Sequence, residues 1–403
     1  MTDSVSASGD GLILVINGGS STLKFALFRN GTTPVREVSG SIDRIGSPEG
    51  TLRWMIEGAA TIAPQAVAVP DHAATIEPLV TCIADRLRDR SLVAIGHRIV
   101  HGGPRYRAPQ LLTSAVMDEL QRLSAYDPEH LPGEIELIRG LVQRYPELPQ
   151  VACFDTAFHR GMPSVARLLA IPRRYEELGL QRYGFHGLSY AFLMRELRRV
   201  GTPDEVKGRV ILAHLGNGAS MAAVRNGRAV DTTMGFTPAS GMPMSRRSGD
   251  LDPGLVYYLA RTEGMSVDRF QCMVNTESGL LGVSGTSSDM RDLLKEERND
   301  SRAAEAVALF CYQAKRSIGS LAAALGGLDT LVFSAGIGEH SPIVRSRICE
   351  GLEFLGIVID PARNEAGETV ISKEGSEVTV RVIRTDEESE IARSVMEIIG
   401  AAM

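Results

Sequence analysis

A glycine turn followed by hydroxyl side chains and a lysine suggests phosphate chemistry near the start of the chain. Residues 12–28 read LILVINGGSSTLKFALF, so a Gly-Gly pair interrupts an apolar run. Side chains alternate faces along a strand, which puts Ser20, Thr22 and Lys24 on one face and Ser21 with the apolar core residues on the other. Glycine lets backbone N–H groups approach an anion closely. The two glycines favour phosphate binding over the alternative, a solvated strand edge with an incidental lysine.

Two more glycine-rich segments, both expected to be loops, follow apolar runs. HLGNG spans His214 to Gly218, and SAGIGEH spans Ser334 to His340. Glycine after a strand is most often only a turn, but three such segments in one chain, all at strand ends, are harder to dismiss as turns alone. The chain contains no GxxxxGK[ST] and no GxGxxG sequence, so neither a Walker A loop nor a dinucleotide-binding fold is predicted.

Several charged or titratable residues are candidates for catalytic or binding roles. Asp155 ends the apolar run VACF, His186 lies in RYGFHG, Arg247 lies in MSRRSGD, and Asp289 and Arg291 lie in SSDMRDLL. Each has a structural alternative: an aspartate after a strand or before a helix is often a cap, such a histidine is more often structural, and the arginine can be ion-paired on the surface.

A carboxylate near the C-terminus is a candidate metal ligand. In RTDEESEI, Thr385 and Glu388 fit the capping box of the helix that follows, which leaves Glu387 without a capping role. A hard carboxylate there, paired with Asn17, suits Mg²⁺ held largely through water. The histidines between residues 97 and 214 show no HExxH or similar spacing, so a zinc hydrolase is not predicted.

Short apolar runs alternate with amphipathic segments, which predicts an α/β fold. Ligands of open α/β sheets bind at strand ends, where many of these candidate residues lie. The expected strands are LILVI, LVAIGHRIV, VACFDTAF, RVILAHL, DTLVFSAG and TVRVIRT, and the expected helices include SAVMDELQRL and EIELIRGLVQRY.

The chain repeats one layout about half a chain apart. ILVINGGSSTLKFALFRNG and VILAHLGNGASMAAVRNG both contain an apolar run, a glycine turn, a second apolar run and Arg-Asn-Gly. Asn-Gly between such runs predicts a tight hairpin turn. We therefore expect two similarly built domains facing each other across a cleft, 11–155 and 156–386, with the terminal helix 387–403 completing the first.

Composition excludes several classes of protein. The chain has 403 residues, 43% of them hydrophobic, and a formal net charge of -6, so it can bury a large core and is not expected to bind nucleic acid. The polar start MTDSVSASGD resembles no signal peptide, and no apolar run is long enough for a membrane span. Five scattered cysteines without a CxxC pair predict neither disulfides nor a zinc site, and several are expected to be buried. We expect a cytoplasmic protein.

Together these motifs resemble the acetate kinase family, within the superfamily of acetate and sugar kinases, heat-shock 70 proteins and actin. The matching pieces occur in family order and span nearly the whole chain. The resemblance implies two ribonuclease H-like domains, usually in a homodimer, and reversible transfer of the ATP γ-phosphoryl to acetate, giving acetyl phosphate and ADP. The pieces are INGGSSTLKF, GHRIVHGG, FDTAFH, RYGFHG, HLGNG, MGFTP, RRSGD, SSDMRDL, SAGIGEH and TDEE.

The resemblance also implies site roles. Asn17 and Glu387 look like the Mg²⁺ positions, with Mn²⁺ as an alternative metal, and Lys24 with Ser20 and Thr22 looks like the phosphate-binding row. In an in-line phosphoryl transfer, negative charge builds up on the equatorial oxygens of the phosphoryl group. The protein therefore mainly positions the reactants and neutralises that charge.

Other matching residues concern the acceptor, the transition state and the nucleotide. Arg98 resembles the residue that holds the acceptor carboxylate, a task suited to a guanidinium fork. Asp155 matches the active-site aspartate; a carboxylate acceptor is already ionised and needs no general base, so Asp155 is expected to orient groups. His186 and Arg247 match the pair that stabilises the transition state. The nucleotide segments are His214, Leu215, Gly216, Asn217 and Gly218; Asp289, Met290 and Arg291; and Gly336, Ile337, Gly338, Glu339 and His340.

The sequence departs from the family pattern in three places. The family commonly has Leu-His-Asn-Pro where this chain reads AYDPEHLPGE, which we interpret as Asp127 at the histidine position with His130 following. The family's Gly-Thr-Arg-Ser is Ser-Arg-Arg-Ser here, with Arg246 in place of the threonine, and Thr22 replaces a serine in the first glycine turn. The first two departures leave propionate or another short acid open as the acceptor.

A different class of function also fits some of these motifs. An actin-like or heat-shock-like module would use ATP to change conformation, and would need Lys24 and the glycine turns but not Arg98. Trapping an acyl phosphate with hydroxylamine distinguishes a kinase from such a switch.

Overall fold

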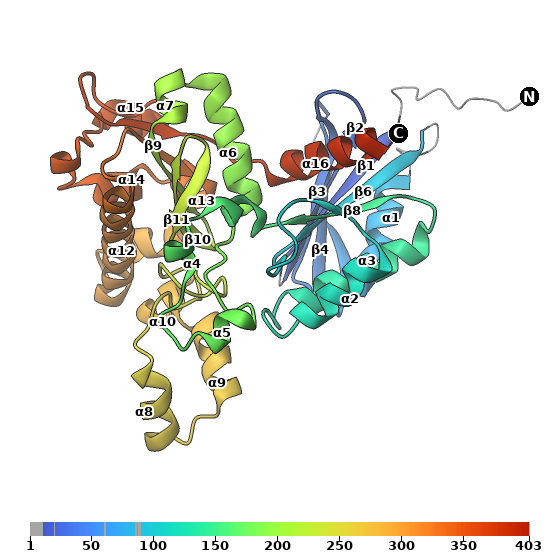
Figure 1. Ribbon diagram of the computed structural model, residues 1–403, viewed down its shortest axis with the longest axis horizontal. Helices are drawn as coiled ribbons and strands as arrows, with labels where there is room; N and C mark the ends of the chain where they lie inside the picture. The colour runs from blue at the N-terminus through green and yellow to red at the C-terminus, as the bar shows by residue number, and fades with distance from the viewer. Residues whose placement is uncertain (1–10, 20, 60–61, 85–86, 88–89, 403) are drawn as a thin grey trace, which may run out of the picture. The chain divides into compact units, whose positions relative to one another are not determined.

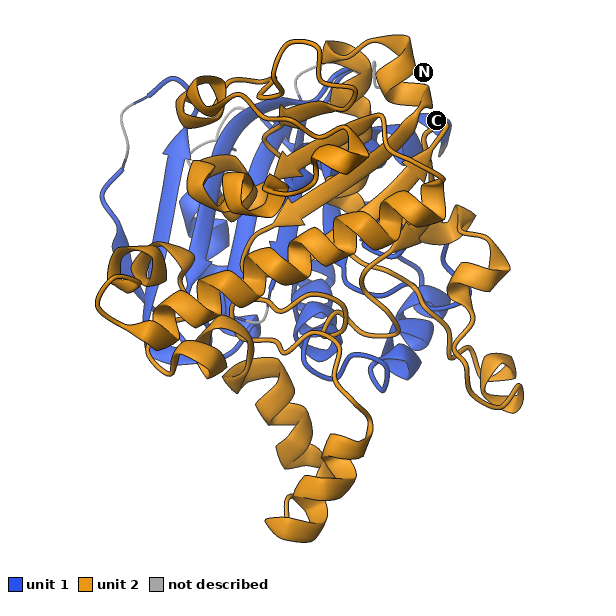
Figure 2. Cartoon of the chain, turned by 90° about the vertical axis from the view of Figure 1, so that its left-hand side faces the viewer, with its two compact units in different colours: residues 1–157, 386–403 blue, residues 158–385 orange. Residues whose placement is uncertain are grey.

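The predicted α/β fold is confirmed by two mixed sheets, one in each of two units of the chain. The computed structural model describes residues 11–19, 21–59, 62–84, 87 and 90–402 (Figure 1). The first unit comprises residues 1–157 and 386–403, and the second comprises residues 158–385 (Figure 2). Within the described ranges, no helix has the length and apolar character that crossing a bilayer requires.

The first unit is built on an eight-stranded sheet with the order β5-β4-β3-β2-β1-β6-β8-β7. Strands β1 to β5 form an antiparallel meander, and β1, β6 and β8 run parallel. The carboxyl ends of those parallel strands therefore meet at one edge of the sheet. The strands are β1 Leu12–Gly18, β2 Thr22–Arg29, β3 Val35–Asp43, β4 Ser47–Ile56, β5 Gln65–Val69, β6 Leu92–Ile99, β7 Gln110–Leu111 and β8 Gln150–Phe154.

Helices cover both faces of this sheet. Leu14 and Phe25 face a core that includes Leu137 of α3. The opposite face carries α16, whose approach requires Gly96, because a Cβ there would lie 2.6 Å from side-chain atoms of Ile391 and 2.6 Å from Val395. The helices of the first unit are η1 Ala73–Thr75, α1 Ile76–Ala84, α2 Ser114–Leu123, α3 Leu131–Arg144 and α16 Glu387–Ala402.

The second unit repeats part of this plan. Its five-stranded sheet has the order β11-β10-β9-β12-β13, with β9, β10 and β11 antiparallel and β9, β12 and β13 parallel. The order β3-β2-β1-β6-β8 of the first sheet has the same directions, which agrees with the predicted repeat. The strands are β9 Arg209–Leu215, β10 Ala219–Arg225, β11 Arg228–Thr232, β12 Thr330–Ser334 and β13 Thr379–Val382.

Two long helices cover the second sheet. α6 packs Tyr190, Leu193 and Leu197 against Leu212 and Val332, and α12 packs against β9, β10 and β11. The helices are η3 Ala157–Gly161 at the unit boundary, α4 Ser164–Arg167, α5 Arg174–Glu177, α6 Gly187–Val200, α7 Pro203–Lys207, α8 Gly254–Thr262, α9 Val267–Cys272, η4 Met273–Glu277, α10 Gly279–Ser284, α11 Met290–Glu296, α12 Ser301–Leu325, α13 Ala335–His340, α14 Pro342–Cys349, η5 Glu353–Leu355 and α15 Pro361–Ala366.

The two Asn-Gly sequences behave differently. Asn226 and Gly227 have φ of 51° and 71° and form the tight turn between β10 and β11, as predicted. The prediction for Asn30 is wrong: Arg29 of β2 pairs with Val35 of β3, so the intervening residues form a longer loop. The Pro34 ring fixes φ and removes an N–H donor, which prevents strand pairing from reaching Asn30.

Cysteine burial follows the prediction. Cys82, Cys153, Cys311 and Cys349 are buried, whereas Cys272 is exposed. Burial raises the pKa of the Cys153 and Cys349 thiols to about 12, so both stay protonated and pack as small apolar residues.

Candidate active site

The glycine turn between β1 and β2 places polar side chains on one face of the first sheet. The Gly19 N–H donates to the Thr22 carbonyl over 2.8 Å, which closes the turn. Thr22 is half-buried and Lys24 is exposed, and Lys24 lies opposite Asn17 in the antiparallel register. The predicted shared face of Thr22 and Lys24 is confirmed. Ser20 lies outside the described residues, and Ser21 is exposed at a bend before β2 rather than on the core face.

A buried ion-pair cluster lies at the carboxyl ends of β6 and β8. Arg98 donates through Nε and Nη2 to Asp155 Oδ2 over 3.0 and 2.6 Å. Its Nη1 donates to the Gly18 carbonyl at 2.8 Å and to Glu134 Oε1 at 3.1 Å. The Asp155 and Glu134 side chains are only 2% and 4% exposed. The guanidinium fork predicted to hold an acceptor is therefore largely engaged by two protein carboxylates.

Burial and charge pairing have opposite effects on the pKa values of this cluster. Burial raises the pKa of Glu134 from 4.5 to about 8, although Arg98 and the Val100 N–H both oppose that rise. Burial acts to lower the pKa of Arg98, but the charges of Asp155 and Glu134 outweigh it and hold that pKa above its ordinary value. Arg98 is thus a permanent cation, and Glu134 is the group of this cluster that titrates near neutral pH.

The predicted metal pair is in contact. Asn17 Nδ2 donates to Glu387 Oε2 at 3.0 Å and to Glu388 Oε1 at 2.9 Å. Two carboxylates beside an amide are hard oxygen ligands of the kind that Mg²⁺ uses together with water and phosphate. The described residues contain no group of three or more His, Cys, Asp or Glu side chains arranged to hold a metal ion alone. The residues fit Mg²⁺ only if water or phosphate supplies the other ligands.

The expected capping box of α16 is wrong. Asp386 rather than Thr385 accepts from the Ser389 N–H, at 2.9 Å, and it also pairs with Arg36. The Thr385 hydroxyl is instead 2.8 Å from Ser189 Oγ. The Thr385 hydroxyl is therefore engaged by a long-range contact, and the Asp386 carboxylate caps the helix.

Two histidines stack beside the glycine turn of the second unit. The His186 and His214 ring centroids are 4.1 Å apart, with the ring planes 22° from parallel. His186 Nδ1 lies 2.8 Å from Ser220 Oγ, and His214 Nδ1 lies 2.8 Å from Ser189 Oγ. His186 has φ of 57°, a left-handed conformation that is uncommon outside glycine and often marks a functional site.

The turn from Gly216 to Gly218 follows Leu215, the buried last residue of β9. A Cβ at Gly218 would lie 3.0 Å from His186 Nε2 and 3.8 Å from Arg247 Nη1. The Asn217 carbonyl accepts from the Ser245 N–H at 3.1 Å, which ties the turn to the segment that carries Arg247. Sequence segments far apart thus bring His186 and Arg247 to one glycine turn.

The other two segments predicted to bind the nucleotide belong to helices: residues 289–291 begin α11, and residues 336–340 lie within α13. Asp289 caps α11 by accepting from the Arg291 N–H at 2.9 Å, as expected if its role is structural. A hydrogen bond from the Arg291 side chain lowers the pKa of Asp289. Met290 is the buried first residue of α11. The segment Gly336 to His340 was expected to be a loop, but it belongs to helix α13.

α13 is held by two charged side chains, Glu339 of the predicted segment and Arg345, which the sequence did not indicate. Glu339 Oε1 accepts from the Ala335 N–H at 2.7 Å and from the Thr385 N–H at 3.0 Å, so it binds the start of its own helix. Arg345, only 1% exposed, donates through Nη1 to the carbonyls of Gly338 and Glu339. These contacts fix the backbone of the segment in which Ile337 and His340 lie.

The assignment of Asp127 to the family's histidine position is wrong. Counting back from Pro128, the family's histidine position falls on Tyr126, and Asp127 takes the place of the asparagine. Asp127 is 4% exposed, and its Oδ1 lies 2.8 Å from His130 Nδ1 at the start of α3. Tyr126 contacts His101 edge to face, with the ring centroids 5.4 Å apart. An aromatic phenol therefore replaces the imidazole at this position.

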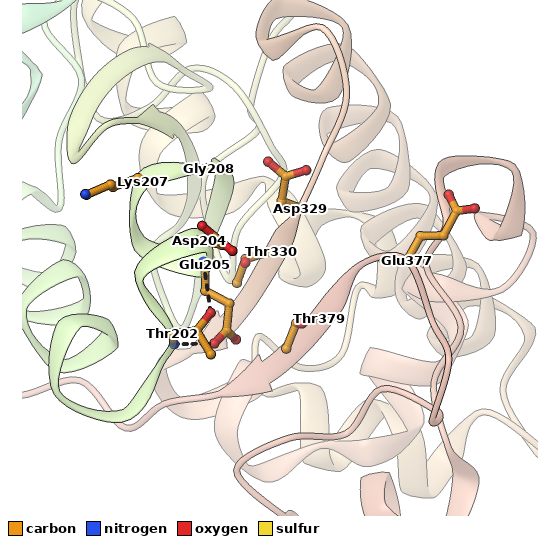
Figure 3. A pocket seen from close by; sticks show the side chains of 9 residues that line it. All are labelled: Thr202, Asp204, Glu205, Lys207, Gly208, Asp329, Thr330, Glu377 and Thr379. Atoms are coloured by element: carbon orange, nitrogen blue, oxygen red, sulfur yellow. Dashed lines mark hydrogen bonds between the residues drawn. The ribbon is translucent and has the colours of Figure 1, made fainter.

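A pocket of about 550 Å³ in the second unit lies away from the glycine turns (Figure 3). It sits where β9, β12 and β13 begin, whereas the turn and α13 follow the ends of β9 and β12. Arginines neutralise two of its carboxylates: Glu205 pairs with Arg381, and Asp329 pairs with Arg209. Among the described residues, its lining still contains four carboxylate residues and a single cation, Lys207, which disfavours binding of nucleotide phosphates. Its lining residues are Thr202, Asp204, Glu205, Lys207, Gly208, Asp329, Thr330, Glu377 and Thr379.

The repeated sheet order and the glycine turns at strand ends define a duplicated, ribonuclease H-like α/β protein. A sequence profile of the acetokinase family matches residues 12–393. The chain is 42% identical to the acetate kinase of Methylocella silvestris over 400 residues, covering 96% of this chain and 98% of that one. It is 44% identical to the acetate kinase of Nitrobacter hamburgensis over 393 residues, covering 96% of each.

Solved structures give the same result. The acetate kinase of Porphyromonas gingivalis superposes with a TM-score of 0.86 at 35% identity, covering 96% of this chain and 100% of the other. A propionate kinase from Francisella tularensis superposes with a TM-score of 0.89 at 36% identity, covering 95% and 98%. The chain belongs to the acetokinase family.

Sequence reasoning missed Glu134, Ser189, Ser220 and Arg345. Each lies outside the motif residues assigned a role. Glu134, Ser189 and Ser220 contact one of those residues only after segments 25 to 36 positions apart have come together. Arg345 reaches Gly338 and Glu339 from the next helix, α14. The sequence contains one weak indication of these contacts: Ser189 lies three residues after His186, within one helical turn.

Proposed function

We propose that this chain catalyses the reversible transfer of the ATP γ-phosphoryl group to acetate, giving acetyl phosphate and ADP. One observation carries the proposal: a family match across residues 12–393 coincides with a buried Arg98–Asp155 pair at the carboxyl ends of β6 and β8. An actin-like conformational switch has no evident use for such a pair at a sheet edge where ligands bind.

Residues of the first unit are proposed to hold the acceptor. Four of the five Arg98 N–H groups point at Asp155, Gly18 and Glu134. Arg98 would therefore hold the acceptor carboxylate with its remaining Nη2 hydrogen and its charge, rather than with a bidentate fork. Asp155, as the partner that fixes the guanidinium plane, would orient Arg98. No general base is needed, because a short carboxylic acid is ionised at neutral pH.

Phosphate binding is proposed for residues of both units. In the first unit, Thr22 and Lys24 offer a hydroxyl and an ammonium beside the glycine turn. In the second unit, His186 and Arg247 would donate to phosphoryl oxygens as negative charge builds up on them. The His214 to Gly218 turn, Asp289 to Arg291 and Gly336 to His340 are proposed to bind the nucleotide.

Mg²⁺ is proposed to bind at Asn17 and Glu387, with Mn²⁺ as a substitute. When bound, the ion would neutralise phosphate charge. The contact between the Asn17 amide and the Glu387 carboxylate supports the assignment, and it indicates that the two side chains are preorganised. Glu388, the second acceptor of the same amide, would hold Asn17 in place.

The test is to mix the purified chain with ATP, Mg²⁺, acetate and hydroxylamine. We expect acyl hydroxamate to accumulate with time and enzyme concentration. No trapped product with any short acid would overturn the kinase proposal and leave the conformational switch. In the same assay, Arg98→Ala should raise the KM for the acceptor far more than the KM for ATP, and equal effects would contradict the role given to Arg98.

Propionate is the alternative acceptor, favoured by the similarity to a propionate kinase and by Tyr126 in place of the family's histidine. One methylene in an apolar pocket changes selectivity by only about 10- to 200-fold. The kcat/KM values for formate, acetate, propionate and butyrate should therefore show a graded preference, and a maximum at propionate would reassign the substrate.

A homodimer is proposed from exposed apolar side chains around α8. Leu255, Tyr257 and Tyr258 of α8 are 39%, 69% and 60% exposed, and Leu251 just before it is 45% exposed. Exposed large apolar side chains gathered in one short segment are typical of an interface. Light scattering should give twice the chain mass of 43.4 kDa, and Tyr258→Glu should give monomers. Phe354→Glu, at a residue 78% exposed in η5, should stay dimeric.

A cytoplasmic location is proposed because the reaction consumes and regenerates ATP. Cell fractionation followed by the hydroxamate assay tests it. Activity confined to the membrane or the medium would contradict this location.

A further inference from the structure

A buried hydroxyl chain connects the first turn of α6 to β10 in the second unit. Ser220 Oγ lies 2.8 Å from His186 Nδ1 and 2.5 Å from the Tyr190 hydroxyl. Tyr190 and Ser220 are both fully buried. The Tyr190 N–H also donates to the His186 carbonyl, at 3.0 Å. One helical turn therefore carries both the imidazole and the phenol that meet the same serine.

The opposite side of the His186 ring faces the glycine turn. A Cβ at Gly218 would lie 3.0 Å from Nε2 and 3.8 Å from Arg247 Nη1. The left-handed backbone of His186 and the Ser220 bond together fix this direction. The ring thus has a buried end, Nδ1, and an end at the turn, Nε2.

The chemistry of the hydroxyls decides which ring nitrogen carries the proton. A serine hydroxyl has one hydrogen and can donate to only one neighbour. A phenol is more acidic than an alkyl alcohol and is the better donor, so Tyr190 donates to Ser220 and Ser220 donates to His186 Nδ1. Nδ1 then acts as the acceptor, and the neutral ring carries its proton on Nε2.

We propose that Ser220 and Tyr190 are positioning residues for phosphoryl transfer, holding His186 in the Nε2–H tautomer with that donor directed to the glycine turn beside Arg247. The inference rests on the proposed function, which gives the Nε2–H group a phosphoryl oxygen to donate to. A neutral donor at this point needs no prior protonation of the histidine. Hydrogen-bond donors fixed toward the negative charge that develops in the transition state are the main means by which such sites lower the activation barrier.

The neighbouring histidine supplies a matched control. His214 Nδ1 also contacts a buried serine, Ser189, at 2.8 Å, and Ser189 Oγ lies 2.8 Å from Thr385 Oγ1. Its ring, however, belongs to the proposed nucleotide turn rather than to the phosphoryl-stabilising pair. Loss of the Ser189 hydroxyl should therefore affect ATP binding, whereas loss of the Ser220 hydroxyl should affect the chemical step.

The first test reads the tautomer directly in the full-length chain. Histidine labelled with ¹⁵N gives separate signals for protonated and unprotonated ring nitrogens, and His186→Gln assigns the signals of His186. At about pH 8, above the ordinary histidine pKa, we expect Nε2 to be protonated and Nδ1 to be unprotonated. The opposite pattern would overturn the proposal. This measurement decides the tautomer even if the wild-type chain forms no acyl hydroxamate, a result that would overturn only the proposed function.

The second test separates positioning from general structure by kinetics. Ser220→Ala is expected to lower kcat about 3- to 10-fold, the effect of one lost hydrogen bond, with both KM values unchanged. Tyr190→Phe keeps the ring, removes only the hydroxyl, and should lower kcat in the same direction; it carries the test if Ser220→Ala does not fold. Ser220→Thr should restore kcat. Ser189→Ala should instead raise the KM for ATP.

Two kinetic outcomes would overturn the proposal. Wild-type kcat in both Ser220→Ala and Tyr190→Phe would show that the hydroxyl chain does not act on the reaction. Equal losses of kcat in Ser220→Ala and Ser189→Ala would show a general packing effect rather than the positioning of His186.

Discussion

Replacing Arg98 by alanine would remove the guanidinium that contacts two buried carboxylates, those of Asp155 and Glu134. Removing one partner of a buried ion pair typically costs about 3–5 kcal/mol. Because burial already raises the pKa of Glu134 to about 8, Glu134 can be neutral near pH 7, and the remaining buried charge is mainly that of Asp155. We therefore expect the lower end of that range, about 3 kcal/mol, in the free energy of unfolding of the first unit.

The pH dependence gives this prediction a second signature. Arg98 opposes the burial-driven rise in the pKa of Glu134, so without Arg98 that pKa rises further and the folded variant keeps the Glu134 proton to higher pH than the wild type. The stability deficit of Arg98→Ala should therefore be larger above about pH 8 than below it. Urea unfolding followed by Trp54 fluorescence measures it, because Trp54 is the single tryptophan of the chain and lies in β4 of the first unit.

Arg36→Ala is the control for this prediction. Arg36 pairs with Asp386, but their side chains are 25% and 32% exposed, so the loss should stay below about 1 kcal/mol and should not change over the same pH range. Equal losses in Arg36→Ala and Arg98→Ala, or a deficit in Arg98→Ala that does not vary with pH, would refute the reasoning about a buried cluster.

Three further predictions follow from individual contacts. Glu387→Gln should raise the Mg²⁺ concentration for half-maximal hydroxamate formation about 10-fold or more, and an unchanged titration would remove Glu387 from the metal site. Asp386→Ala should lower the thermal stability of the first unit by about 1 kcal/mol through loss of the α16 cap, read from Trp54 fluorescence on heating. Glu134 has a folded pKa of about 8 against an ordinary 4.5, so its contribution to stability is complete below pH 4.5 and is lost as pH rises through 8. Glu134→Gln should make the midpoint of urea unfolding nearly independent of pH between 4.5 and 8. A wild-type midpoint that does not fall as pH rises through this range would contradict the raised pKa.

The sequence predicts what local patterns control. Alternation along residues 22–29 assigns Thr22 and Lys24 to one face because the other face of β2 is buried in the core. The Asn226–Gly227 turn is predictable because both residues adopt positive φ, which few other residues tolerate. Strand and helix positions follow from hydrophobic periods for the same reason: each period matches a surface that must be buried.

Distant contacts account for the errors. Thr385 fits a cap by sequence, but its hydroxyl contacts Ser189, 196 positions away, and Asp386 caps the helix instead. Glu134 is separated from Arg98 by 36 positions and lies on a helix whose pattern marks no carboxylate for burial. Hydrophobic periodicity does not specify which polar side chain contacts which site residue. These partners could therefore be found only in the folded chain.

The repeated sheet explains why a chain of net charge -6 can be expected to bind polyanions. In each unit, a hairpin turn follows a strand that runs parallel to its inner neighbours, so the turn and the carboxyl ends of those strands share one sheet edge. In the first unit that edge carries Lys24 and Arg98; in the second, His186 and Arg247 meet at the glycine turn. Topology thus concentrates the donors where ligands of α/β sheets bind, and the proposed phosphate binding depends on this local placement rather than on net charge.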